Sequence, residues 1–343
     1  MPSRFASVSD VTLLYRENVR VVNEQLLISL SADSGLTLSR ELTRSDGASF
    51  GQIVSLQSAS DVFDFSAADP YEGKLERCYE TIKKYVVNAT ATAPAVPATV
   101  VDPLQAISEL SGNLTEGELL SRVRRIVAVL GGTQFIYQWV RFDGKGSRTD
   151  DPVEARYLVG CRPAWLQQYI ARLWYMNDPH LSYARSSAAP ALAAHINLHP
   201  ADHWLVTEAR MHGLASGVIV PAHSPAGRGL VGILQVSNGM QTTDSASLLW
   251  KNHVLLRALS CALLDWQITQ VRKKAARQYN LSDDETLALK TLRAGGGASH
   301  IADQLGVSVS TVYKSIFRHI NKKTGVSRIN EAVEKATAVG LLD

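Results

Sequence analysis

Apolar residues alternate with polar ones in some stretches of the chain and recur at helical spacing in others. Alternation over residues 36–42, 133–142 and 156–160 predicts β-strands, because successive side chains of a strand point to opposite faces. A Pro- and Gly-containing turn between residues 217–223 and 230–237 predicts a hairpin. Apolar residues three and four apart predict helices over residues 11–27, 71–87, 115–130, 163–175 and 248–271.

One of these helices carries its own start and stop signals. Thr115 followed three residues later by Glu118 is a capping-box pattern, and Gly131 with Gly132 ends the periodic stretch. We therefore expect a well-defined helix between them.

Changes in composition divide the chain. The small, Pro- and Ala-rich stretch near residues 88–103 lacks amphipathic periodicity and predicts a linker. We expect an α+β multidomain protein: an α/β extension of unknown role (1–88), a linker (89–102), an α-β-α layered domain (103–265), a second linker (266–277) and an all-helical domain (278–343).

The C-terminal segment has the pattern of a helix-turn-helix. Ser282 can cap a first helix that ends at Gly295, and residues 299–305 form a short second helix. Gly306 turns the chain, and Ser308 caps a third helix over residues 309–323, with Val312, Ile316 and Ile320 on its buried side.

The third helix combines side chains that read base edges with side chains that bind phosphate. We expect DNA contacts from Ser310, Thr311, Tyr313, Lys314, Phe317, Arg318 and Lys322, with Lys323 and Arg328 on phosphates past its end. The alternative is a solvated helical hairpin with ordinary surface lysines.

Positive charge is concentrated in the same segment. Residues 272–343 hold 12 Lys/Arg and 7 Asp/Glu, a net +5, whereas residues 1–271 hold 23 and 25, a net −2. A basic domain attached to a nearly neutral one is typical of a protein that binds a polyanion.

The C-terminal 65 or so residues resemble the DNA-binding domain of LuxR-type regulators. The resemblance is carried by Glu285, Leu289, Gly295, Ile301, Ala302, Leu305, Val307, Ser308, Thr311, Val312, Lys322 and Arg328. It implies a four-helix domain that reads short inverted DNA repeats as a homodimer. Ser315 and Lys323 depart from the family, which more often has His and Leu there.

Residues 103–265 resemble the autoinducer-binding domain of the same family. The resemblance is carried by Trp165, Tyr169, Asp178 and Pro179, then Ala209, Gly213, Gly217 and Pro221. It implies an α-β-α sandwich that buries an acyl-homoserine lactone. The indole of Trp165 would donate to the lactone carbonyl, Asp178 would accept from the amide, Tyr169 would pack on the acyl chain, and Gln235 would lie near a 3-oxo group.

Two positions of the expected pocket depart from the family. Ala193 stands where a second Trp is usual, and Cys161 where a Tyr is frequent. The pocket is therefore expected to take a bulkier or different apolar ligand, or none. A regulator that works without a ligand, or through a protein partner, remains the alternative function.

Composition excludes several other classes. The chain has 343 residues, 45% hydrophobic and 20% charged, which is typical of globular proteins. It shows no apolar run of membrane-spanning length and no secretion signal, so we expect a cytoplasmic protein without a membrane partner. Three widely spaced cysteines fit neither disulfides nor zinc, and no motif frames a catalytic nucleophile, so we expect no enzyme, metal or cofactor.

Overall fold

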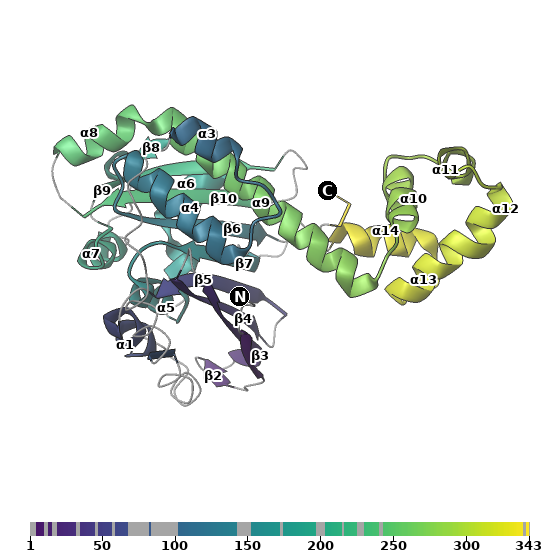
Figure 1. The fold of residues 1–343 in the computed structure, drawn as a ribbon, viewed down its shortest axis with the longest axis horizontal. Helices are drawn as coiled ribbons and strands as arrows, with labels where there is room; N and C mark the ends of the chain where they lie inside the picture. Colours follow the sequence, from purple (N-terminus) through teal and green to yellow (C-terminus); the bar gives the residue numbers. More distant parts are fainter. Residues whose placement is uncertain are drawn as a thin grey trace. The chain divides into compact units, whose positions relative to one another are not determined.

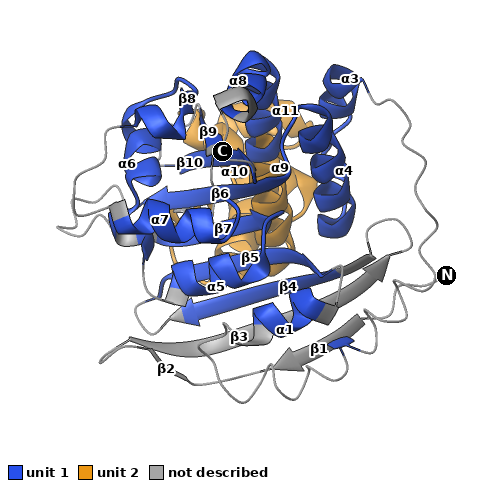
Figure 2. Cartoon of the chain, turned by 90° about the vertical axis from the view of Figure 1, so that its left-hand side faces the viewer, with its two compact units in different colours: residues 1–264 blue, residues 265–343 orange. Residues whose placement is uncertain are grey.

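The computed structural model describes most of the chain. The described residues are 5–9, 13–15, 19–31, 35–44, 47–56, 59–67, 82–83, 102–142, 152–171, 174–196, 203–214, 216–224, 230–239, 243–338 and 341–342. The chain divides into two compact units, Met1–Leu264 and Asp265–Asp343 (Figures 1 and 2). The predicted linker 89–102 and most of the predicted helix 71–87 lie outside the described residues.

Unit 1 is built on one sheet of ten described strands in the order β1-β3-β4-β5-β7-β6-β10-β9-β8, with β2 paired to β3. The strands are β1 (Phe5–Ser9), β2 (Leu13–Tyr15), β3 (Val19–Ser31), β4 (Gly35–Arg44), β5 (Ser49–Leu56), β6 (Gln134–Phe142), β7 (Pro152–Val159), β8 (Ala191–Leu192), β9 (Ser216–His223) and β10 (Leu230–Asn238). The predicted strands and the predicted hairpin of β9 and β10 are confirmed.

The N-terminal strands extend the sheet of the layered domain. β5 pairs in parallel with β7, from Ser49 opposite Glu154 to Val54 opposite Val159, and β3, β4 and β5 pair antiparallel. The predicted helix over 11–27 is wrong, because this stretch contributes to β2 and β3. Its Val- and Leu-rich sequence pairs with β2 at Val19–Val21 and with β4 from Val21 onward, and such pairing overrides a weak local helical pattern.

Helices cover both faces of the sheet. The face that carries Leu38, Ile136 and Ile219 packs on α1 (Ala59–Ala67), α5 (Pro163–Ala171), α6 (Pro179–Ser186) and α7 (His203–Met211), with two short turns η2 (Trp174–Asn177) and η3 (Ala193–His195). Figure 2 shows α1 and α5 as neighbours. The remaining helices of unit 1 are α3 (Pro103–Ser108), α4 (Glu116–Val129), α8 (Thr243–Lys251) and α9 (His253–Tyr279), which continues into unit 2.

The predicted capping box of α4 is confirmed. Thr115 Oγ1 accepts from the Glu118 amide at 3.3 Å, and Glu118 Oε2 accepts from the Thr115 amide at 2.8 Å. Gly131, at φ 92°, ends the helix in a conformation that favours glycine. The predicted helix over 248–271 is instead broken between α8 and α9 around Asn252.

Unit 2 is helical over its described residues. It holds α10 (Asp283–Arg293), α11 (Ala298–Leu305), α12 (Val309–Thr311), a π-helical stretch η5 (Val312–Phe317), α13 (Arg318–Thr324) and α14 (Ile329–Ala338). Gly306 ends α11 at φ 64° and ψ 33°, and Ser308 caps the following helix by accepting from the Thr311 amide at 3.1 Å. The core includes Leu289, Ile301, Val312 and Ile320.

Candidate functional site

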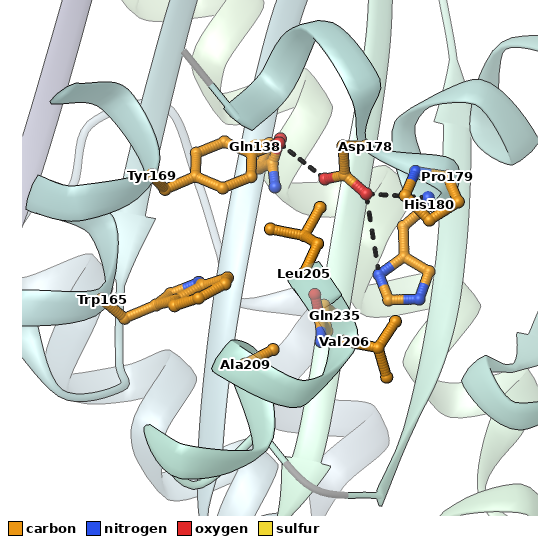
Figure 3. Close-up of a pocket in the computed structure, with 10 residues that line it drawn as sticks. All are labelled: Gln138, Trp165, Tyr169, Asp178, Pro179, His180, Leu205, Val206, Ala209 and Gln235. Atoms are coloured by element: carbon orange, nitrogen blue, oxygen red, sulfur yellow. Dashed lines mark hydrogen bonds and ion pairs between the residues drawn. The ribbon is translucent and has the colours of Figure 1, made fainter. Parts of the chain in front are cut away.

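A pocket opens between the sheet and the helices on the α5 side of unit 1 (Figure 3). Two strands supply its floor and three helices its walls, and the space among the lining atoms and at the mouth is about 320 Å³. The lining residues are Gln138 of β6, Gln235 of β10, Trp165 and Tyr169 of α5, Asp178, Pro179 and His180 at the start of α6, and Leu205, Val206 and Ala209 of α7.

Asp178 has both a structural and a pocket-facing role. It is the N-cap of α6, where Oδ1 accepts from the His180 amide at 2.8 Å. Its other oxygen, Oδ2, accepts from the Tyr169 hydroxyl at 2.6 Å (Figure 3). The Asp-Pro pair therefore begins a helix here, and the same carboxylate offers an acceptor to the pocket.

Burial determines the protonation of the groups around Asp178. It raises the pKa of Tyr169 well above its usual value, and the neighbouring Asp178 raises it further, so Tyr169 keeps its proton and donates. Burial also lowers the pKa of His180, although Asp178, 3.9 Å from its Nδ1, opposes that shift. The pocket thus holds a neutral phenol and a neutral imidazole beside Asp178 at neutral pH.

Aromatic rings form one wall of the site. The centroid of the Trp165 ring lies 5.4 Å from that of Trp174, 5.9 Å from that of Tyr169 and 5.5 Å from that of His212. Each of these ring pairs is tilted. Trp165 is 5% exposed. Such a wall favours an apolar or planar ligand surface.

Two glutamines stand on the floor of the pocket. Gln235 lies opposite Ile136 in the pairing of β10 with β6, and Gln138 lies two residues further along β6. The sequence reasoning identified Gln235 but missed Gln138. The sequence pattern that could have revealed Gln138 is a glutamine within the apolar run FIYQWV, where a strand side chain is expected to be buried.

The other predicted ligand residues do not line this pocket. Cys161 is buried close to Arg124, and burial raises the pKa of its thiol to about 12. Ala193 is half-buried in η3 against the core. Gly217 lies in β9, where a Cβ would come within 2.7 Å of Ser237 Oγ, so its role is close packing of two strands.

The predicted DNA-contacting side chains are gathered on one segment of unit 2. The exposed members are Ser310, Thr311, Tyr313, Lys314, Arg318 and Lys322, all between Ser308 and Thr324. The expected DNA contact of Phe317 is corrected by the structure, because its side chain is 7% exposed and belongs to the core of the unit. Its ring packs edge-on against Tyr313 at 5.3 Å, so it supports an exposed residue instead of reaching a groove itself.

Lys323 also differs from the expectation of a phosphate contact. Its Nζ lies 2.6 Å from Glu285 Oε2, and Glu285 is buried at the start of α10. The lysine at this unusual position therefore ties α13 to α10.

Residues 115–265 match the autoinducer binding domain family. The chain is similar to the transcriptional activator protein PhzR of Pseudomonas fluorescens, with 26% identity over 193 residues that cover 54% of this chain and 75% of PhzR. It is similar in structure to SdiA in complex with octanoyl-rac-glycerol (20% identity, TM-score 0.45, covering 71% of this chain and 98% of SdiA). A crystal structure of Escherichia coli SdiA gives 20% identity and a TM-score of 0.45 over 70% of this chain and 96% of that one.

These findings confirm the resemblance to LuxR-type quorum-sensing regulators, with residues 115–265 matching the autoinducer binding domain. The match includes every residue that lines the pocket. Over the described residues, every helix is too short or too polar to cross a bilayer. Nowhere in that same part of the chain do three or more His, Cys, Asp or Glu side chains gather as metal ligands would.

Proposed function

We propose that this protein is a DNA-binding transcription regulator whose unit 1 senses a small apolar molecule with a hydrogen-bonding head group. The observation that carries the proposal is that Trp165, Tyr169, Asp178 and Gln235, four residues expected from sequence, line one pocket inside the autoinducer-binding domain.

The chemistry of this pocket suits an acyl-homoserine lactone or a ligand of the same kind. The aromatic wall would cover apolar surface, and Asp178 would accept a hydrogen bond from an amide or hydroxyl. A ligand donor at Asp178 Oδ2 competes with the Tyr169 hydroxyl, which already lies there at 2.6 Å. Binding therefore exchanges one hydrogen bond for another, and most of the affinity is expected from apolar burial.

Unit 2 supplies the surface for double-stranded DNA. The segment after Gly306 exposes Lys314, Arg318 and Lys322 together with Ser310 and Tyr313. The short helix α11, the turn at Gly306 and the helix that follows support a helix-turn-helix. The cations would contact phosphates, and the others would approach base edges. As in the family that it resembles, the protein would bind an inverted repeat as a homodimer.

A second candidate is a LuxR-type regulator that needs no ligand or responds to a protein partner. Two observations favour it. Cys161 and Ala193 lie outside the pocket lining, and the Asp178 carboxylate already has two donors without any ligand.

The two candidates are separated by ligand response in the full chain. We expect a lactone panel to raise the melting temperature and change the affinity for a selected DNA site, and Trp165→Phe or Asp178→Asn to remove both responses. Asp102→Asn is a matched control, since Asp102 also caps a helix that starts with proline but lies at α3. Loss of DNA binding under all conditions would overturn the first proposal, and DNA binding without any ligand response would favour the second.

A further inference from the structure

A row of buried polar side chains crosses the sheet from the pocket into the N-terminal strands. Gln138 of β6 lies opposite Tyr157 of β7, Tyr157 opposite Gln52 of β5, and Gln52 opposite Arg40 of β4. Residues in register on neighbouring strands share a face of the sheet. All four side chains are at most 6% exposed.

The row begins at the pocket and passes beneath α5. Gln138 lines the pocket, and the ring of Tyr157 lies 6.2 Å from that of Tyr169. At the far end, Gln167 Oε1 of α5 lies 3.5 Å from Gln52 Nε2 and 3.4 Å from Arg40 Nη1. The helix that carries Trp165 and Tyr169 into the pocket therefore also covers the rest of the row.

Three polar atoms of the row and one of α5 have no hydrogen-bond partner among the described residues. They are Gln138 Oε1, the Tyr157 hydroxyl and Gln52 Oε1 in the row, and Gln167 Nε2 on α5. Buried polar atoms without partners destabilise a fold, so native proteins pair nearly all of them with protein, water or ligand. Three of these atoms follow the row from the pocket and the fourth faces it from α5, so a polar group bound beside them would supply the missing partners.

Resting on the proposed sensing function, we propose that the ligand site continues along this row and takes an elongated amphiphile with a second hydrogen-bonding group. The head group binds near Asp178, and a hydroxyl or carbonyl on the distal chain binds between Tyr157, Gln52 and Gln167. Gln138 and Gln52 are separated by two strand spacings, about 10 Å. The head group and the distal hydroxyl or carbonyl of the ligand are therefore separated by an acyl chain of medium length.

The N-terminal strands give this chain its selectivity. Gln52 and Arg40 precede the family match, which begins at residue 115, whereas Trp165 and Asp178 lie within it. The extension of unknown role thus supplies the distal end of the site.

The test compares N-octanoyl, N-decanoyl and N-dodecanoyl homoserine lactones with their ω-hydroxy forms on the full chain, by calorimetry. We expect one ω-hydroxy form to bind about tenfold tighter than its methyl-terminated parent, the gain from one buried hydrogen bond to a previously unpaired atom. Methyl-terminated ligands that bind as well or better at every length would overturn the extended site while leaving the sensing function intact. Failure of every ligand to bind would count against the sensing function itself.

Variants locate the second group. Gln52→Leu and Gln167→Leu should abolish the hydroxyl preference while methyl-terminated ligands still bind, and Gln168→Leu, half-buried on the same helix, should keep it. A hydroxyl preference that survives both substitutions would overturn the placement. If either variant fails to fold, the ligand series on the unmodified protein still decides the proposal.

Discussion

Lys323 and Glu285 are joined across unit 2, with Lys323 Nζ 2.6 Å from Glu285 Oε2. The same carboxylate oxygen accepts from the Ser282 amide at 2.8 Å, within the capping box of α10. One side chain therefore caps the first helix of the unit and holds the helix that follows the predicted groove-binding segment.

Removing the lysine should loosen both helices. Lys323→Met leaves a buried carboxylate without its cation, and we expect a loss of about 1–3 kcal/mol in the local stability of α10 and α13. Hydrogen exchange of peptides from these helices in the full chain measures it. Lys322→Met is the matched control: Lys322 is exposed, so DNA affinity should fall while exchange stays unchanged. Equal exchange in the two variants would contradict the structural role of the pair.

The same pair gives unit 2 a defined response to acid. Burial raises the pKa of Glu285, but hydrogen bonds from Lys323 and the Ser282 amide outweigh it, so the folded-state pKa lies below the usual 4.5. A carboxyl whose pKa is lower in the folded state than in the unfolded state stabilises the fold at pH values above its unfolded-state pKa. That stabilisation is lost as the pH falls through the folded-state pKa. The stability difference between the unmodified protein and Glu285→Gln should therefore shrink below about pH 4.5. A difference that stays constant down to pH 3 would argue against this ion pair.

Basic residues after Gly306 should control DNA binding through salt. Lys314→Ala and Arg318→Ala are each expected to weaken binding of the full chain and to reduce the slope of log K against log salt by about one. Lys290→Ala, exposed on α10, serves as the control and should leave the slope unchanged. Fluorescence anisotropy at several salt concentrations provides the measurement, and unaltered slopes for both test variants would remove these residues from the interface.

The turn between α11 and the following helix depends on glycine. Gly306 adopts φ 64°, and a Cβ there would meet nothing within 4 Å, so a substitution costs only backbone energy. Gly306→Ala should destabilise unit 2 by about 1–2 kcal/mol, and Gly306→Asn by less, because asparagine tolerates the left-handed region. Chemical denaturation of the two variants tests this order, and an equal loss would show that the backbone is not the cause.

Two cysteines should differ sharply in reactivity. Burial raises the pKa of Cys161 to about 12, whereas Cys261 is exposed. In a Cys78→Ser background, iodoacetamide at pH 8 should modify Cys261 and leave Cys161 intact until the protein is unfolded. Mass spectrometry of digested peptides gives both rates. Comparable rates in the folded protein would place Cys161 at an accessible surface.

Local signals in the sequence determined much of the helical structure. Thr115 with Glu118, Ser308, and Gly306 specify helix ends through contacts within a few residues, and the structure has those ends where they were expected. The alternation of β9 and β10 around a turn is also a local property. Trp165, Tyr169 and Asp178 were found because their spacing resembles a family pattern, and they meet in one pocket.

Only the tertiary structure decided which faces are buried and what lies beside them. Phe317 has a spacing compatible with exposure, but the core beneath Val312 and Ile320 encloses it. Residues 19–31 became a strand because β4 pairs with them from Val21 to Ser31, and β5 joined β7 across about a hundred residues of chain. Pairing between distant strands depends on hydrogen bonds that a local sequence pattern does not specify. The polar row from Gln138 to Gln52 is therefore visible only in the tertiary structure.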